Sequence, residues 1–255
     1  MTIAVGGQRS AVWMWPVAVW RLLRVCLHIL FGLWLVYFRQ QGKDEAWRMD
    51  STRQWAVRLL AILGIRLEVQ GRARPGAKLI VANHVSWLDI MAIDAVVPSR
   101  FVSKAEVGRW PLVGALVTAA GTLYLQRERR RDAMRVLGLM SAALQGGSTV
   151  AVFPEGTTGS GHGVLPFHAN LLQAAIDAKV PVQPIVLRYS DKRHAISPRA
   201  AYVGDTTLMQ SLWRVVSSSG LTVHVTVLAP LAVDHADRRS LAHTLQDMLS
   251  SAIPR

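Results

Sequence analysis

A histidine and an aspartate stand five residues apart in NHVSWLD, residues 83–89. The segment directly follows LIVA, residues 79–82, an apolar run typical of a buried strand. Polar residues at the end of such a strand lie at the rim of a sheet, where catalytic groups are commonly displayed. If Asp89 accepts a hydrogen bond from one ring nitrogen of His84, the other nitrogen can act as a general base.

Asp89 also has a purely structural interpretation. Ser86 and Asp89 match the capping-box pattern [ST]-x-x-[DE], in which a serine begins a helix and an acidic residue lies three positions later. The two interpretations are compatible, because a carboxylate in the first helical turn lies close to a histidine just ahead of that helix. The segment by itself leaves both open.

Three further segments bring polar residues or a proline to the ends of apolar runs. They are GTLYLQR (121–127) with Arg127, FPEGTTG (153–159) with Glu155 and Gly156, and VPVQPIVL (180–187). The turn proline and the flexible glycine of the second segment are typical of a loop at a sheet rim. Candidate chemical groups therefore recur at several predicted strand ends.

Taken in order, the four segments resemble the signatures of the glycerolipid acyltransferase family typified by 1-acyl-glycerol-3-phosphate acyltransferases. The family motifs are NHxSxxD, GxxFxxR, FPEGT and VPxxPI, and each has a counterpart here. SKAEVGRWPLVG, residues 103–114, is similar to a fifth family segment. The resemblance covers about residues 65–190, and the ordered set is far more specific than any one motif.

The resemblance implies an O-acyltransferase in which His84 is the general base and Asp89 orients it. His84 would take the proton of a free lysolipid hydroxyl, which attacks the carbonyl of an acyl thioester. Backbone N–H groups at the start of the helix after His84 are candidates for stabilising the oxyanion. We expect no metal and no other cofactor, because acyl-CoA or an acyl carrier protein thioester is the co-substrate.

A set of acceptor-binding residues is implied as well. Lys104, Arg127, Glu155, Gly156 and Thr157 would bind the acceptor head group or shape its pocket. Two of them have alternatives: Glu155 could pair with Arg127, and Lys104 could be a solvated surface residue.

Thr158 departs from the pattern, because many family members that use phosphate-bearing acceptors continue FPEGT with arginine. Threonine cannot replace the bidentate grip of arginine on phosphate. We expect 1-acyl-glycerol-3-phosphate as the acceptor, giving phosphatidic acid, since Lys104 and Arg127 remain available for its phosphate. A lysolipid without that phosphate, such as lyso-ornithine lipid, is the alternative.

Other classes of enzyme lack their signatures. There is no G-x-S-x-G for a serine hydrolase, no P-loop or G-x-G-x-x-G for nucleotides, and no HExxH or Cys/His cluster for zinc. His162 and His168 are interpreted as ordinary polar residues. A non-catalytic membrane-binding protein remains the alternative from another class.

The charge points to an anionic partner. The net charge is +13, with 29 basic and 16 acidic residues, which suits a phospholipid surface, an acidic carrier protein or nucleic acid. Six of the nine tryptophans fall within the first 55 residues, beside arginines, a combination that prefers the headgroup layer of a bilayer. No nucleic-acid-binding signature is present, so we expect a lipid bilayer as the partner and no nucleic acid.

Residues 11–38 predict an amphipathic helix at the membrane interface. One face carries Arg21, Arg24 and His28, and the other carries Trp20, Leu23, Leu27, Leu30 and Trp34. Each arginine would cost about 2.5–3.5 kcal/mol at the bilayer centre, which argues against spanning. A second amphipathic helix over 47–63 would complete a membrane-docking hairpin. We therefore expect a peripheral or monotopic protein of the inner membrane, with its catalytic domain on the cytoplasmic side. If the first helix spans instead, the basic residues after it outnumber Arg9 before it, which would also leave the main body cytoplasmic.

From about residue 66 onward, apolar runs alternate with helical stretches. The predicted strands are 66–71, 78–82, 100–103, 122–125, 148–153, 182–189 and 221–229, and the predicted helices are 87–96, 110–119, 130–145, 168–178 and 238–252. This alternation predicts an α/β fold with a largely parallel or mixed sheet flanked by helices. The expected division is a membrane-associating part, 1–64, and an α/β acyltransferase domain, 65–255.

Overall fold

Seven strands form one mixed sheet. The computed structural model describes residues 14–126 and 130–253, and within them the strand order is β1-β7-β6-β2-β5-β3-β4. Neighbouring strands are parallel except for β6 and β7, which are antiparallel. The α/β fold predicted from the alternation of apolar runs and helical stretches is therefore confirmed.

The element bounds follow the predicted ranges closely. The strands are β1 (Arg66–Gln70), β2 (Lys78–Ala82), β3 (Arg100–Lys104), β4 (Leu123–Leu125), β5 (Thr149–Val152), β6 (Val182–Ser190) and β7 (Thr222–Val227). The helices are α2 (Met14–Trp34), α3 (Glu45–Leu63), α4 (Leu88–Val96), α5 (Val113–Ala119), α6 (Arg130–Gln145), α7 (Gln173–Ala178), α8 (Leu208–Val216) and α9 (Arg238–Ala252), with short helical turns at Leu35–Arg39, Ala105–Arg109 and Ala169–Leu172.

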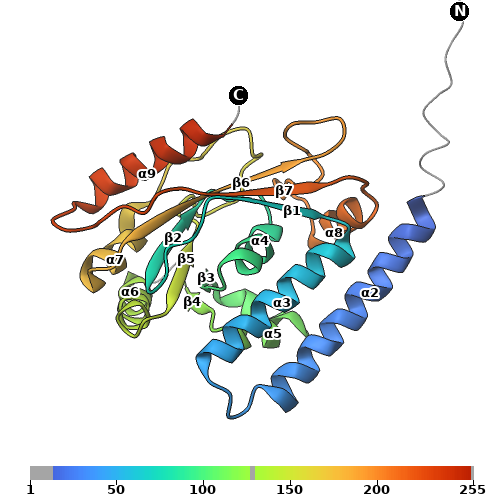
Figure 1. Cartoon of the computed structure of the whole chain (residues 1–255), viewed down its shortest axis with the longest axis horizontal. Coiled ribbons are helices and arrows are strands. Elements are labelled where there is room, and N and C mark those ends of the chain that lie inside the picture. Colours follow the sequence, from blue (N-terminus) through green and yellow to red (C-terminus); the bar gives the residue numbers. More distant parts are fainter. Residues whose placement is uncertain (1–13, 127–129, 254–255) are drawn as a thin grey trace, which may run out of the picture.

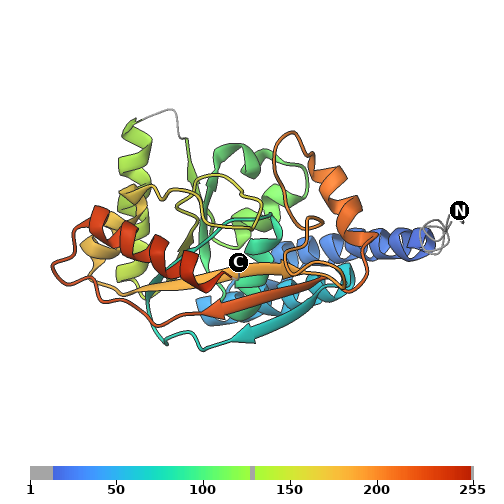
Figure 2. The same ribbon diagram turned by 90° about the horizontal axis from the view of Figure 1, so that it is seen from above.

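Alternate residues of the central strands pack on opposite faces of the sheet. Leu79 and Val81 of β2 join the core formed with α6, α7 and α9, whereas Ile80 and Ala82 join the core formed with α3, α4 and α8. Figure 1 shows α9 above the sheet and α3 and α4 below it, and Figure 2 shows α6 and α8 well apart, with α6 toward the left and α8 toward the right. Burial on both faces explains why β2 reads as a continuous apolar run.

Parallel pairing brings the carboxyl ends of four strands to one edge of the sheet. Val81 of β2 pairs with Val152 of β5, and Lys104 of β3 pairs with Leu125 of β4. The segments that follow these strands therefore begin side by side, as the sequence predicted for its candidate site residues. We call this side of the sheet the catalytic edge.

The two N-terminal helices form the expected hairpin, but their apolar sides point in different directions. Helix α3 begins after Asp44, whose side chain accepts a hydrogen bond from the backbone N–H of Trp47. Its apolar residues Leu59, Leu60 and Leu63 are buried against the α/β body. The apolar side of α3 thus belongs to the protein core, so only α2 turns an apolar face outward.

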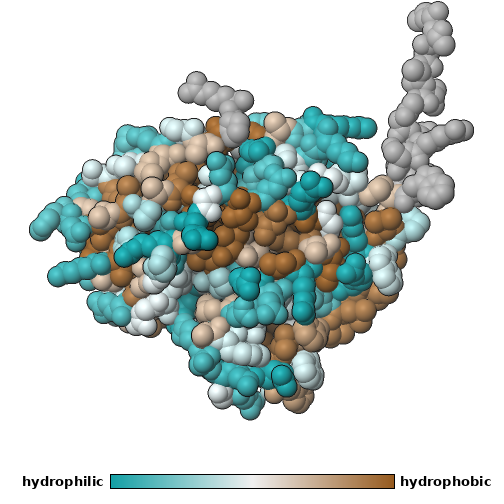
Figure 3. Space-filling model, viewed as in Figure 1, coloured by the Kyte–Doolittle hydropathy of each residue, from teal (hydrophilic) through white to brown (hydrophobic). Residues whose placement is uncertain are grey.

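Helix α2 exposes the face that the sequence marked as apolar. Its residues Trp20, Leu23, Leu27, Leu30 and Trp34 have exposed fractions between 47% and 59%. Figure 3 shows the resulting hydrophobic surface along the flank formed by this helix. The segment Met14–Arg39 is long and apolar enough to cross a membrane by length and composition.

The opposite face of α2 attaches the helix to the protein through polar contacts. The Arg21 guanidinium donates hydrogen bonds to the carbonyls of Val216 (2.9 Å) and Ser218 (2.7 Å) at the end of α8. His28 stacks on Trp55 of α3 with ring centroids 4.7 Å apart, and its Nε2 lies 3.0 Å from the Trp55 carbonyl. Two residues of the polar face predicted from the sequence, Arg21 and His28, therefore contact protein, whereas the third, Arg24, is exposed.

Helix α8 was not predicted, although the sequence contains a signal for it. The Thr207 hydroxyl accepts a hydrogen bond from the backbone N–H of Gln210, and the Gln210 side chain accepts one from the backbone N–H of Thr207. This reciprocal capping box requires a T-x-x-Q pattern, which the chain contains.

We expect Arg21→Ala to lower the free energy of unfolding by about 1–3 kcal/mol, because two carbonyls lose a charged donor. Chemical denaturation monitored by circular dichroism measures the change. Arg24→Ala is the matched control, since Arg24 is exposed on the same helix. Equal losses in both variants would show that the contact with α8 does not hold α2 in place.

Candidate active site

Asn83 ends the pairing of β2 with β6 and places His84 at the catalytic edge. The Asn83 side-chain amide donates to the Leu187 carbonyl at 2.9 Å, and its oxygen accepts from the Leu187 N–H at 2.8 Å. These two bonds occupy the backbone groups of β6 that the next residue of β2 would otherwise pair with. The chain therefore leaves the sheet at His84.

His84 and Asp89 are in direct contact. The ring Nδ1 of His84 lies 2.8 Å from Oδ2 of Asp89, as the sequence predicted. The Asp89 side chain is fully buried, whereas the His84 side chain is 19% exposed. Among the described residues no group bonds to Nε2 of His84, so this nitrogen is available to a substrate.

Three other donors hold the Asp89 carboxylate. Its Oδ2 accepts hydrogen bonds from the backbone N–H groups of Val85 (2.6 Å) and Ser86 (2.8 Å), and its Oδ1 accepts one from the Tyr189 hydroxyl (2.7 Å). Four donors around one carboxylate suit its anionic form. Because Asp89 acts as the acceptor, Nδ1 of His84 must carry the hydrogen, which leaves Nε2 free to take a proton.

The capping-box interpretation of Ser86 and Asp89 is only half fulfilled. The Asp89 carboxylate accepts from the Ser86 N–H, as that motif requires, but the buried Ser86 hydroxyl has no hydrogen-bond partner within the described part of the chain. Because Asp89 uses the N–H groups of Val85 and Ser86, these two groups are not free to stabilise an oxyanion. Stabilisation of the oxyanion would therefore require other backbone N–H groups.

Tyr189 is a member of the site that sequence reasoning missed. It lies on β6, 100 residues from Asp89, and no local pattern marks it. Burial raises the pKa of its hydroxyl well above the usual value, and the Asp89 carboxylate adds to the rise. The hydroxyl therefore stays protonated and keeps donating to Asp89.

Phe153 fixes the plane of the His84 imidazole. The two rings are stacked with centroids 3.9 Å apart and planes 10° apart, and Phe101 of β3 lies 5.9 Å from Phe153 on centroids. The stack removes water from one face of the imidazole. Hydrogen bonding to Asp89 and stacking on Phe153 together leave the ring with one orientation.

Glu155 supports His84 through the backbone. Its Oε1 accepts from the His84 N–H at 2.6 Å, and its Oε2 accepts from the Leu165 N–H at 2.9 Å. Burial raises the pKa of the Glu155 carboxyl, while these two donors oppose the rise. Gly156 has a φ of 70°, a left-handed conformation that glycine adopts without strain. Glu155 is only 4% exposed, so its observed partners are the loop and His84.

Of the remaining predicted acceptor-binding residues, the structure describes Lys104 and Thr157 but not Arg127. Lys104 and Thr157 are exposed at the catalytic edge and make no polar side-chain contact with the residues described. Arg127 lies outside the described residues, so its predicted pairing with Glu155 stays a prediction. Thr158 donates its hydroxyl to the Tyr202 carbonyl, which ties the FPEGT loop to the segment before α8.

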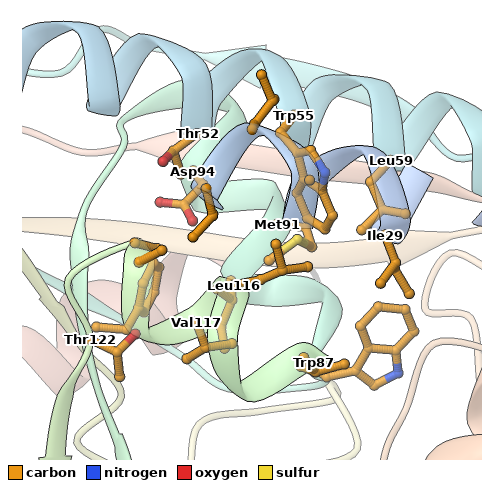
Figure 4. Close-up of a pocket in the computed structure, with 18 of the residues that line it drawn as sticks. Ile29, Thr52, Trp55, Leu59, Trp87, Met91, Asp94, Leu116, Val117 and Thr122 are labelled. Carbon is orange, nitrogen blue, oxygen red and sulfur yellow. The ribbon is translucent and has the colours of Figure 1, made fainter. Parts of the chain in front are cut away.

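An open apolar groove lies beside the site, between the helical hairpin and α4, α5 and β3. Its volume is about 1560 Å³ when the open side is included. Its lining includes Trp55 and Leu59 of α3, Met91 of α4, and Trp87 just before α4 (Figure 4). Phe101 also lines it and packs on Phe153, which stacks on His84. The groove and the histidine thus share an aromatic wall. In the described parts of the chain, no cluster of three His, Cys, Asp or Glu residues could hold a metal ion.

Comparison with known proteins identifies the family. The family model described as "Acyltransferase" matches residues 66–188. The 1-acyl-sn-glycerol-3-phosphate acyltransferase of Neisseria meningitidis serogroup B is 40% identical over 198 residues, which cover 76% of this chain and 77% of that protein. The chain belongs to the acyltransferase family. The resemblance predicted from the ordered motifs is therefore confirmed.

A second relative and a solved structure of the same fold differ in their named acceptors. The lyso-ornithine lipid O-acyltransferase of Pseudomonas aeruginosa is 37% identical over 207 residues, covering 81% of this chain and 79% of that protein. The crystal structure of the 1-acyl-sn-glycerophosphate acyltransferase PlsC from Thermotoga maritima matches with a TM-score of 0.73 at 20% identity, covering 96% of both chains. The structural match shows that the whole described fold is shared. The sequence matches place the chain among enzymes that acylate lysolipids.

We expect Tyr189→Phe to lower kcat by about tenfold without raising KM for the lysolipid, because the Asp89 carboxylate loses one donor while the substrate contacts stay intact. Steady-state kinetics with a lysolipid acceptor measures the split. Tyr37→Phe is the control, since Tyr37 is 58% exposed on the turn after α2. If Tyr189→Phe lowers the free energy of unfolding but leaves kcat unchanged, the role of Tyr189 is only structural.

Proposed function

We propose that this acyltransferase moves a fatty acyl group from an acyl thioester to the free hydroxyl of a lysolipid, with His84 as general base. One observation carries the proposal. His84 donates from Nδ1 to the buried Asp89, its side chain is 19% exposed, and no described residue bonds to its Nε2. A base in this state can accept the proton of an alcohol.

The reaction then needs no protein nucleophile. Nε2 of His84 takes the hydroxyl proton as the acceptor oxygen attacks the thioester carbonyl carbon. The tetrahedral intermediate collapses, the carbon–sulfur bond breaks, and the imidazolium returns the proton to the leaving thiolate. Asp89 stabilises the imidazolium and holds its tautomer. General base catalysis of this kind contributes roughly 10²–10⁴-fold in rate.

The apolar groove beside the site suits the acyl chain. Its lining is almost entirely apolar near Trp87, only three residues from His84. Burying a chain there removes apolar surface from water, which favours binding by about 25 cal/mol per Å². The donor is acyl-CoA or an acyl carrier protein thioester, whose anionic head would meet a chain of net charge +13.

For the acceptor we propose 1-acyl-glycerol-3-phosphate, giving phosphatidic acid. Lys104 is exposed at the catalytic edge and, with Arg127, would contact the phosphate, while Gly156 and Thr157 shape the loop beside it. Lyso-ornithine lipid is the second candidate. It is favoured by Thr158, whose hydroxyl already bonds to the Tyr202 carbonyl and which supplies no cation for a phosphate.

We also propose that the protein acts on the cytoplasmic face of the inner membrane. The exposed apolar face of α2 supports docking into the headgroup region, because such a face is favourable only against lipid or another protein. The positive net charge supports attraction to anionic lipids.

We expect His84→Ala to reduce acyl transfer at least about 100-fold while the protein still folds, because the general base is lost. The assay offers labelled acyl thioester with lysophosphatidate and lyso-ornithine lipid in parallel. His243→Ala is the control, since its side chain is 81% exposed on α9.

Near wild-type turnover by the His84 variant would exclude the mechanism. In the wild type, a larger yield of phosphatidic acid supports the first acceptor. A larger yield of diacyl ornithine lipid would establish the second candidate instead.

We expect a variant with Leu23, Leu27 and Leu30 changed to serine to lose membrane binding by about tenfold or more, since three half-exposed apolar side chains leave the lipid contact. Flotation with anionic phospholipid vesicles measures the bound fraction. The matched control changes Met134, Leu139 and Met209, which are 69%, 42% and 69% exposed on other helices. If the two variants bind vesicles equally, the membrane contact does not involve the exposed leucines of α2.

A further inference from the structure

The groove has two chemically different ends. Trp87, just before α4, and Asp94, in its last turn, both line the groove. Along α3, which runs the other way, Leu59 lies toward the Trp87 end and Thr52 lies beside Asp94 (Figure 4). Seven residues of α-helix span about 10 Å along the helix axis, so Trp87 and Asp94 are separated by about that distance along the groove.

The lining changes from apolar to polar along this path. Ile29, Leu59 and Trp87 surround one end, where Trp87 is three residues from His84 in the sequence, and Met91 and Leu116 lie in the middle (Figure 4). The far end holds polar groups from three elements, namely Thr52, Asp94 and Thr122. A hydrocarbon chain that enters at the Trp87 end would therefore meet Thr52, Asp94 and Thr122 at its distal part.

Asp94 is the chemically unusual member of this far end. The residue is 3% exposed, and its Oδ1 accepts one hydrogen bond from the Ser99 N–H at 3.0 Å. Its other oxygen makes no hydrogen bond or ion pair with any residue that the structure describes, although the side chain lines the groove. Arg48, one turn before Thr52, is the other ionisable residue of the described lining, and it is exposed.

The protonation state of Asp94 determines whether its side chain can donate a hydrogen bond to a ligand. Burial raises the pKa of its carboxyl to about 8, with the Ser99 N–H opposing the rise. Near neutral pH the side chain therefore carries a proton, which its free oxygen can donate. A buried donor without an acceptor is unfavourable, so the far end favours a ligand with a polar atom at that depth.

Resting on the acyl transfer proposed above, we propose that Asp94 is a specificity-determining residue for the acyl chain. The far end of the groove takes a hydroxyl carried on the distal part of the chain. It disfavours the methylene groups of an unsubstituted chain of the same length, because these would cover the Asp94 oxygen without bonding to it. Thr52 and Thr122 supply further hydroxyls around the same position.

The structural role of Asp94 can be separated from this ligand role. Asparagine keeps an oxygen to accept from Ser99 and places an amide donor toward the groove, whereas leucine removes both. Asp94→Asn should therefore keep the preference for a hydroxylated chain, and Asp94→Leu should lose it. Thr122→Val is a milder second variant, because it removes one neighbouring hydroxyl and leaves the Asp94–Ser99 bond in place.

The test is a competition between two acyl-CoA substrates of equal length, one unsubstituted and one hydroxylated near its methyl end. The ratio of the two acylated products is measured for the wild type and the three variants. Asp205→Leu is the matched control for replacing a carboxylate, since Asp205 is exposed in the loop before α8. We expect the hydroxylated-to-unsubstituted ratio to fall about tenfold in Asp94→Leu, to fall less in Thr122→Val, and to stay near wild type in Asp94→Asn and Asp205→Leu.

A second measurement does not depend on turnover. The two corresponding free fatty acids compete with a fluorescent fatty acid for binding to the same proteins, and unfolding curves verify that each variant folds. Equal ratios for the wild type and Asp94→Leu in both measurements would overturn the role of Asp94. A hydroxyl preference in binding without any acyl transfer would reject the proposed function and leave the role of Asp94 standing.

Discussion

The catalytic edge depends on the burial of one carboxylate. Removing a charged Asp89 from water is costly unless every lone pair finds a donor, and the protein supplies four donors from the backbone, His84 and Tyr189. Satisfying Asp89 fixes the turn after β2, the tautomer of His84 and the position of β6 relative to α4. The same hydrogen bonds that offset the cost of burying the Asp89 carboxylate therefore orient the His84 imidazole.

A second carboxylate completes this arrangement from the other side. Glu155 accepts from the backbone of His84 and from Leu165, so the loops after β2 and β5 are joined through it. Asp89 orients the ring of His84 and Glu155 holds its main chain. The ring and the backbone are thus restrained independently, and a general base needs both restraints to keep a short approach to a substrate hydroxyl.

Much of this arrangement could be predicted from local sequence, and the remainder required long-range contacts. The His84–Asp89 contact is predicted by the position of the pair at a strand end together with the ordered family motifs, and the mixed sheet follows from the alternation of apolar runs and helices. Tyr189 could not be found this way, because its role arises from the pairing of β6 beside β2. Amphipathicity located both faces of α2, but it could not show that Arg21 meets the end of α8 instead of water.

Helix α2 is shared between two environments. Its outer side exposes residues such as Leu23 and Leu27, while Val25 and Ile29 from its inner side line the groove. A single helix diameter, about 10 Å, therefore separates the interior space from whatever touches the outside. A tilt of α2 would change both the width of the groove and the apolar surface that the helix exposes on its outer side. Ligand binding in the groove and binding at the outer face of α2 are therefore coupled through this helix.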